Sequence, residues 1–82
     1  MDSFLTITHT VTCRKAAEVC NQARRHSEII RLEKNGKQVD CKSFLGLLSL
    51  NIMFGDSIRI IVDGENEEYV LNEISQFLRD NI

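Results

Sequence analysis

The interval between apolar residues changes repeatedly along the chain, and this change constrains the fold more than any other feature. Leu5 and Ile7 stand two positions apart, as do apolar residues within 57–62, which is the period of a half-buried strand. Within 14–26 and 70–78 the apolar residues instead recur at intervals of three and four, which places each set on one stripe of a helix. The chain is therefore predicted to combine strands with helices.

A β-hairpin is predicted around Asn35-Gly36. Apolar residues alternate in 30–32 and again in 39–41, and an Asn-Gly pair between two such stretches tolerates the positive φ angles of a type I′ turn. A short helix is expected to follow from Phe44 to Leu50, with Ser43 as its N-cap. The expected order is strand, helix, strand, strand, helix, strand, helix.

These seven elements must share one core, because 82 residues suffice for one domain only. Three helices and four strands bury their apolar faces when the helices stack on one side of the sheet, so residues 1–82 are expected to form a two-layer α+β sandwich. The other face of the sheet would meet water. The polar residues expected on that open face are Thr6, Arg31, Glu33, Asp40 and Arg59.

The charge of the chain argues against two classes of partner. Ten Lys and Arg oppose twelve Asp and Glu, a formal charge of −2, which removes the bulk electrostatic attraction to nucleic acid or to an anionic membrane. The distribution is uneven, since 14–42 carries eight basic and four acidic residues whereas 56–82 carries two basic and seven acidic. One end of the molecule is therefore expected to attract anions or an acidic partner.

The cysteine content indicates reduced thiols. Cys13, Cys20 and Cys41 are odd in number and match neither a disulfide framework nor a CxxC metal site, so no metal and no cofactor are expected. Reduced thiols are typical of the cytoplasm. No charged-then-apolar leader and no long apolar stretch occur, and neither a secretory signal nor a membrane span is predicted. A cytoplasmic protein is expected.

The stretch from Asn35 to Leu50, NGKQVDCKSFLGLLSL, resembles the HPr family, the small phosphocarriers of the bacterial sugar phosphotransferase system. The likeness lies in the hairpin, in the Lys42-Ser43 pair that opens the short helix, in Gly46 within it and in the Ser-Leu pair that closes it. The element order matches as well, from Leu5 to the last helix. The resemblance implies an open-faced sandwich, with a four-stranded antiparallel sheet and three helices on one face.

The sequence departs from the family at the site of its chemistry. Family members carry a His-x-Arg-Pro motif, whose histidine takes phosphate from phosphorylated enzyme I and passes it to sugar-specific proteins. Aligning Arg14 with the arginine of that motif places Thr12 at the histidine, Cys13 at the variable position and Lys15 at the proline. A threonine phosphoester is too stable to be a transferable intermediate. The resemblance thus indicates a divergent member without the active-site histidine.

The predicted start of the first helix is still a candidate phosphate-binding site. Free backbone N–H groups, the helix dipole and two cations would meet there. The residues concerned are Thr12, Cys13, Arg14 and Lys15. Cys13 is also a candidate acceptor, because dipole and cations favour its thiolate, and His9 is a second one in the preceding loop. The alternative is that Thr12 only caps the helix and that the other side chains are solvated.

Ser43 is the candidate regulatory residue. In HPr relatives from low-GC Gram-positive bacteria, the serine at this position is phosphorylated by a dedicated ATP-dependent kinase, and the modified protein is a corepressor for a catabolite-control transcription factor. A phosphate there would gain backbone donors and a favourable dipole at the start of the short helix. The alternative is a serine that only caps this helix.

The short helix and the loop after it carry more apolar surface than one helix of this size can hide. In the family this helix forms an exposed apolar patch that docks partner proteins. The residues of the predicted docking patch are Phe44, Leu45, Leu48, Met53 and Phe54. The neighbours predicted to face the core are Leu47, Leu50 and Ile52.

The sequence is interpreted as a regulatory or protein-binding module of the sugar phosphotransferase network that catalyses nothing by itself. The expected partners are proteins of that network or of catabolite control, with a serine kinase that modifies Ser43. One alternative is a phosphoryl carrier that uses Cys13 or His9 as its acceptor. Another is a domain adapted to an unrelated protein partner. The oligomeric state is left open by the sequence.

Overall fold

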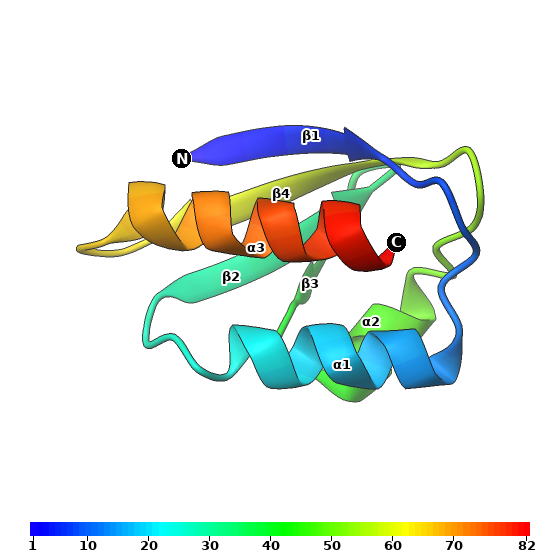
Figure 1. Ribbon diagram of the computed structural model, residues 1–82, viewed down its shortest axis with the longest axis horizontal. Helices are drawn as coiled ribbons and strands as arrows, with labels where there is room; N and C mark the ends of the chain where they lie inside the picture. The colour runs from blue at the N-terminus through cyan, green and yellow to red at the C-terminus, as the bar shows by residue number, and fades with distance from the viewer.

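Four strands and three helices follow one another in the predicted order. The computed structural model describes residues 1–82, and Figure 1 shows its elements. They are β1 (Asp2–Thr6), α1 (Cys13–Ala23), β2 (Ile29–Lys34), β3 (Lys37–Asp40), α2 (Phe44–Ser49), β4 (Ser57–Asp63) and α3 (Glu67–Asn81). None of the three helices has the length and apolarity of a membrane-spanning segment.

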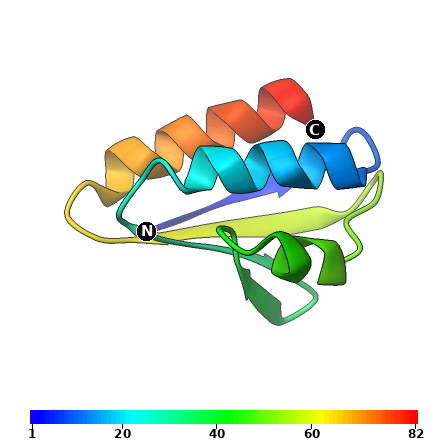
Figure 2. The ribbon, with the colours of Figure 1, turned by 90° about the horizontal axis from the view of Figure 1, so that it is seen from below.

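The strands form one antiparallel sheet in the order β1-β4-β2-β3. The central strand β4 pairs on one side with β1 and on the other with β2. Helices α1 and α3 lie over one face of this sheet, and α2 lies beside α1 and against β3, as Figure 2 shows. The two-layer sandwich and its antiparallel sheet are confirmed, and the remaining face carries no helix.

The core lies between the helices and the sheet. Alternate residues of β2 and β4 point into it and are fully buried, among them Ile30, Ile60 and Val62. The period of two in these strands thus divides their side chains between the two faces of the sheet. The helical stripes meet them from the other layer: the buried residues of α1 and α3 are Ala16, Val19, Cys20, Ala23, Val70, Leu71, Ile74, Ser75 and Leu78.

The hairpin turn has the predicted geometry. Asn35 has φ of 52° and Gly36 has φ of 82°, the pair of positive angles that defines a type I′ turn. The strands on either side then pair in register, with Lys34 opposite Lys37 and Leu32 opposite Val39. The Asn-Gly pair therefore determined the position of this turn.

The helix predicted from Phe44 to Leu50 ends at Ser49, and the ends of the first helix and the first strand also differ from the prediction. The helix expected to reach His26 ends at Ala23, because the chain tightens into a 3₁₀-type turn in which the His26 N–H donates to the Ala23 carbonyl at 3.1 Å. The first strand ends at Thr6, although Ile7 is buried as its period predicts. The Ile7 N–H still donates to the Asp56 carbonyl at 2.8 Å, so the chain remains attached to the loop before β4.

The third helix begins without a side-chain cap of its own. Instead, the buried Glu28 carboxylate accepts a hydrogen bond from the Asn66 N–H at 3.3 Å and brings negative charge to the positive end of the helix. Gly64 makes room for it: its φ is 154°, and a Cβ on this residue would lie 2.6 Å from Glu28 Cγ. The connection from β4 to α3 therefore depends on glycine at this position.

Candidate functional site

The start of α1 is organised by Thr12. This residue is exposed and extended, and its Oγ1 accepts a hydrogen bond from the Lys15 N–H at 3.2 Å. Thr12 is therefore the N-cap of α1. Cys13 is the first helical residue, and its thiol is exposed and free. A hydroxyl and a thiol thus occupy the first positions of this helix.

The two cations of this helix do not converge on its N-terminus. Arg14 Nε lies 3.8 Å from a carboxylate oxygen of Glu18, and Lys15 Nζ lies 3.4 Å from the other oxygen. Both side chains thus follow the helix surface toward Glu18, in contrast to the predicted arrangement. Exposed ion pairs of this kind contribute about 0–1 kcal/mol. The cost of turning either cation toward a bound anion is therefore small.

The loop before α1 holds His9 apart from these groups. The His9 side chain is exposed, and its Nδ1 lies 3.2 Å from the hydroxyl of Thr8. The N–H groups of both residues donate to the carbonyl of Ile82, at 2.9 Å from Thr8 and 3.2 Å from His9. No hydrogen bond or ion pair joins His9 to Cys13 or to Arg14.

The other two thiols are buried between α1 and the segment that leads into α2. Burial raises the pKa of Cys41 to about 12, so this thiol stays protonated at neutral pH. Cys20 Sγ donates to the Lys42 carbonyl at 3.1 Å and contributes to the core. Cys13 is therefore the only thiol that reagents in solution can reach.

The start of α2 is organised by Ser43. Its Oγ accepts a hydrogen bond from the Gly46 N–H at 3.1 Å, so the predicted N-cap is present. Ser43 is half-buried, unlike Thr12. A Cβ on Gly46 would lie 3.2 Å from this hydroxyl oxygen and 3.4 Å from Val39 Cβ, which explains why a residue without a side chain suits this helix.

Three residues of the docking patch are strongly exposed. Leu45 is 76% exposed, Phe54 72% and Met53 48%. Phe44 and Leu48 are half-buried and pack against the core, so they anchor the exposed residues. The expected inward set is also in place, since the buried neighbours are Leu47, Leu50 and Ile52.

A cluster that the sequence analysis missed fixes the loop that carries Met53. Lys34 Nζ lies 2.8 Å from a carboxylate oxygen of Asp56 and donates to the Asn51 carbonyl at 2.7 Å. The same oxygen of Asp56 accepts from the Met53 N–H at 2.8 Å. These hydrogen bonds, that from Lys34 foremost, lower the pKa of Asp56. The β2–β3 hairpin thus holds the loop after α2.

The chain is similar to known proteins over most of its length. The family model described as the PTS HPr component phosphorylation site matches residues 5–80, nearly the whole chain. The chain belongs to the HPr family. Among curated relatives it is 33% identical over 69 residues to the HPr-like protein Crh of Bacillus subtilis, covering 84% of this chain and 81% of that protein.

Solved structures agree with this assignment. An HPr phosphocarrier from Bacillus anthracis has a TM-score of 0.88 and 29% identity, with 95% of each chain covered. The crystal structure of Crh from Bacillus subtilis has a TM-score of 0.80 and 29% identity, and covers 95% of this chain and 90% of that one. That structure is described as a dimer with a swapped domain.

In this HPr-family protein the start of α1 and the docking patch are separate surfaces. The first presents a hydroxyl, a thiol and two cations paired with Glu18, whereas the second presents apolar side chains next to Ser43. Helices α1 and α2 lie side by side, as Figure 2 shows. A partner that covers both helices would therefore contact both surfaces.

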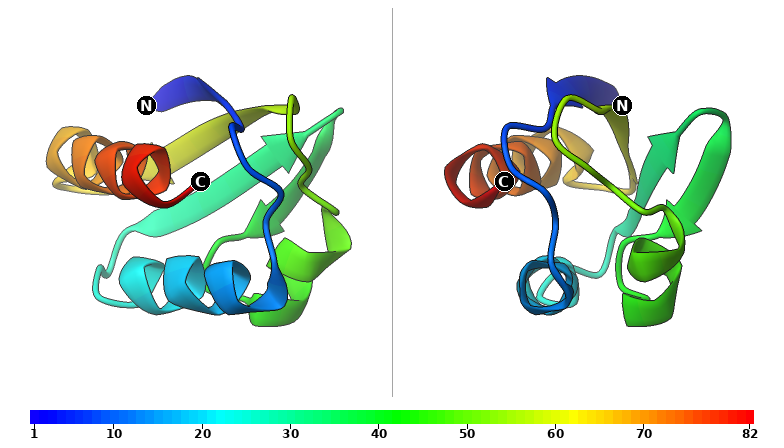
Figure 3. Two further views of the ribbon diagram at one scale, coloured as in Figure 1. Left: turned by 45° about the vertical axis from the view of Figure 1, so that its right-hand side comes forward. Right: turned by 90° about the vertical axis from the view of Figure 1, so that its right-hand side faces the viewer.

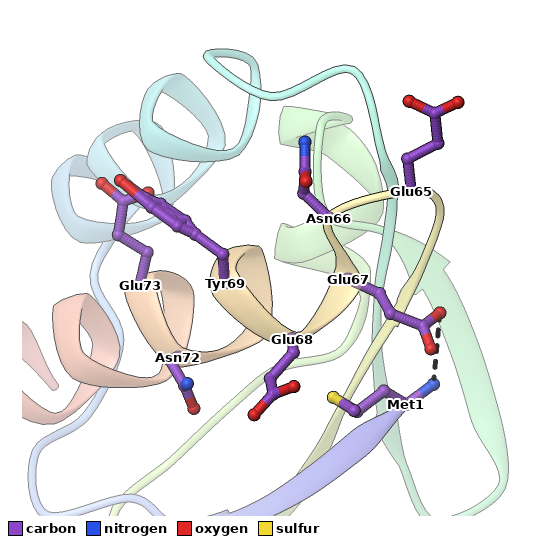
Figure 4. Close-up of a pocket in the computed structure, with 8 residues that line it drawn as sticks. All are labelled: Met1, Glu65, Asn66, Glu67, Glu68, Tyr69, Asn72 and Glu73. Atoms are coloured by element: carbon purple, nitrogen blue, oxygen red, sulfur yellow. Dashed lines mark ion pairs between the residues drawn. The ribbon is translucent and has the colours of Figure 1, made fainter.

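A third feature lies at the start of α3 and is acidic. Figure 4 shows a shallow hollow there, whose lining is dominated by glutamates of α3 and of the turn before it. The terminal amine of Met1 lies 3.9 Å from Glu67 Oε2. The carboxylates of Glu65, Glu68 and Glu73 point in different directions. No group of three or more His, Cys, Asp or Glu side chains is arranged to hold a metal ion.

Proposed function

We propose that residues 1–82 act as one HPr-like domain that regulates or binds proteins of the sugar phosphotransferase network without carrying transferable phosphate. The observation behind this proposal is the start of α1. A threonine hydroxyl is engaged there as the N-cap, and neither histidine of the chain forms a hydrogen bond or ion pair with the first turn of this helix. A carrier of the family needs an imidazole at this point, because a phosphorylated nitrogen transfers its group readily and a threonine ester does not.

Regulation is proposed to act through phosphate on Ser43. Its oxygen already accepts a backbone N–H at the start of α2, so phosphate oxygens attached to it would meet the same donor. The added negative charge would stand beside Lys42, the residue before it in the chain. The likeness to Crh, a protein described with catabolite repression, supports a regulatory role.

The partners are proposed to dock on the apolar patch. Leu45 and Phe54 are exposed enough to be buried by a partner, and aromatic and aliphatic anchors of this kind dominate the energetics of many interfaces. Ser43 immediately precedes this patch, so its phosphate would lie at the rim of the interface. A charge at the rim of an interface affects the choice of partner more than it affects the apolar contacts at the centre.

The test is to compare two phosphorylation routes. The protein is incubated either with phosphoenolpyruvate and enzyme I or with ATP and the serine kinase of an HPr-containing organism, and intact and peptide masses are measured before and after acid treatment. The proposal expects acid-stable phosphate from the kinase route only, on Ser43. Ser43→Ala should abolish it. Ser49→Ala is the matched control, because Ser49 is the other serine of the α2 region and is exposed.

Two other results would replace the proposal. An acid-labile group from the enzyme I route on His9, or a phosphorothioate on Cys13, would make the protein an unconventional carrier. Absence of phosphate by both routes, with an ordinary HPr as positive control, would favour a domain adapted to an unrelated protein partner.

A further inference from the structure

The end of α1 presents a cation to the segment that leads into α2. Arg24 is exposed, and its Nε donates a hydrogen bond to the Lys42 carbonyl at 3.1 Å. This carbonyl belongs to the peptide bond between Lys42 and Ser43, so the guanidinium lies one peptide group away from the residue proposed to carry phosphate. Cys20 Sγ donates to the same carbonyl at 3.1 Å. Two side chains of α1 thus hold this peptide in place.

The two neighbouring arginines at the end of α1 lie on different flanks of the helix. In the right-hand view of Figure 3, α1 is seen along its axis, with α3 on one side of it and α2 on the other. Arg24 lines a hollow between α1 and α2 together with Phe44, the residue after Ser43. Arg25 instead lines a hollow with Phe77 of α3. Only Arg24 therefore faces the start of α2.

The charge of Arg24 is not compensated within the molecule. Neither Arg24 nor Lys42 takes part in an ion pair. The bond from Nε is the only side-chain hydrogen bond of Arg24, so both of its Nη groups are free to donate. One acid lies in the same segment, since the Asp40 carboxylate accepts the Lys42 N–H at 2.9 Å. Two unpaired cations and one acid thus surround Ser43.

We propose that phosphate on Ser43 is bound within the molecule by the guanidinium of Arg24, so that phosphorylation fastens the start of α2 to the end of α1. This inference rests on the proposed modification of Ser43 and adds the side chain that receives the phosphate. The planar fork of a guanidinium fits two phosphate oxygens, and such charge-assisted hydrogen bonds are stronger than neutral ones. The bond from Nε to the Lys42 carbonyl already restricts this side chain, which lowers the entropy lost when the phosphate binds.

The ion pair has two consequences for the docking patch. Phe44 and Leu45, two residues of the patch, directly follow Ser43. A further link between α1 and the start of α2 preorganises this part of the patch, and a preorganised surface loses less entropy when a partner binds. The phosphate also keeps charge at the rim, because one guanidinium compensates only part of its charge of about −1.5 to −2.

The test is a phosphorus NMR titration of the full chain with phosphoserine incorporated in place of Ser43 during synthesis. Arg24→Gln is expected to raise the pH midpoint of the second phosphate ionisation by about half a unit or more, because the guanidinium favours the dianion. Arg24→Lys keeps the charge but lacks the planar fork, so it should raise the midpoint by less. Asp40 and Lys42 are present in every variant, and their effects cancel in the comparison.

Arg25→Gln is the matched control. It removes the same charge one residue further along the chain, on the flank that faces α3, and should leave the midpoint nearly unchanged. Urea denaturation gives a second measurement. Phosphate should raise the urea midpoint of the unsubstituted chain and of Arg25→Gln, and should raise that of Arg24→Gln much less. Circular dichroism should confirm that each variant is folded.

Two results would overturn the proposal. The first is a titration midpoint that is the same with and without Arg24. The second is an equal shift in Arg25→Gln, which would indicate the general field of α1 rather than a bound phosphate. Because the phosphoserine is incorporated during synthesis, the titration requires no kinase. A kinase that leaves Ser43 unmodified would refute the proposed regulation but would not alter this comparison.

Discussion

The starts of α1 and α2 use the same capping chemistry in different surroundings. Thr12 and Ser43 each accept a hydrogen bond from the N–H three residues on, at 3.2 Å and 3.1 Å. Thr12 is exposed and is followed by a thiol and two cations, whereas Ser43 is half-buried and is followed by apolar side chains. A hydroxyl cap is therefore compatible with either kind of surface, and the neighbours decide what the site can bind.

The contrast suggests a division of tasks within an HPr-family fold. The first site keeps two cations in weak, exposed ion pairs, but its capping residue is not suited to phosphoryl transfer. The second keeps a serine at the edge of an apolar patch. Substitutions at the start of α1 and in the docking patch test whether α1 lacks only its phosphate acceptor and whether the patch binds the partner.

The largest effect is expected from Thr12→His. If the start of α1 lacks only a nucleophile, the new imidazole should accept phosphate from phosphorylated enzyme I, changing the acid-labile product from undetectable to measurable. The measurement is mass spectrometry before and after acid treatment. Thr12→Ala is the control and should stay unmodified. An unmodified Thr12→His would mean that Lys15 or the short preceding loop also prevents the reaction.

The second effect concerns recognition at α2. Changing Leu45 and Phe54 together to lysine should weaken binding of the Ser43-phosphorylated protein to a catabolite-control transcription factor by about thirtyfold or more, as expected for loss of interface anchors. Isothermal titration calorimetry measures the dissociation constant. Tyr69→Lys, at an exposed aromatic residue of α3, should change it little. An equally large loss of affinity in Tyr69→Lys would contradict a recognition site confined to the docking patch.

The third effect is on stability and compares the caps directly. Thr12→Ala and Ser43→Ala should each lower the free energy of unfolding by about 1 kcal/mol. The loss should be larger for Ser43→Ala, because it leaves the Gly46 N–H without an acceptor in a half-buried place. In Thr12→Ala, water can accept the hydrogen bond from the exposed Lys15 N–H instead. Urea denaturation followed by circular dichroism gives both values. A larger loss of stability in Thr12→Ala than in Ser43→Ala would show that burial does not determine the contribution of these caps.

The smallest effect is expected from pH at the loop after α2. The pKa of Asp56 is lowered in the folded protein by Lys34 and the Met53 N–H. Its contribution to stability is therefore complete above the unfolded value near about 4 and is lost as pH falls through the lower folded value. Asp56→Asn should flatten the stability profile below about pH 4. Asp80→Asn, an exposed control in α3, should keep the profile of the wild type.

The predictable parts of the fold are those encoded by local sequence. A type I′ turn requires positive φ at two residues, which Asn35-Gly36 tolerates, and Ser43 before helical spacing indicates a cap, so the turn and the cap were both predicted to the residue. The residues that face outward near α2 were also predictable, because one short helix cannot bury them all.

Other features depend on contacts between distant parts of the chain. The Lys34–Asp56 pair joins residues 22 apart in sequence, and Glu28 reaches Asn66 across 38 residues. Neither pair produces a spacing pattern in the sequence from which it could be predicted. The direction taken by Arg14 and Lys15 was likewise missed, although Glu18 stands three and four residues beyond them, the spacing at which helix side chains meet.

The difference among the three cysteines has a practical consequence. Since Cys20 and Cys41 are buried and Cys13 is exposed on the first turn of α1, a maleimide fluorophore would attach at one place without any engineered substitution. That place adjoins the cations Arg14 and Lys15. Binding of a partner near α1 can thus be followed in the wild-type chain by the fluorescence of one dye attached to Cys13.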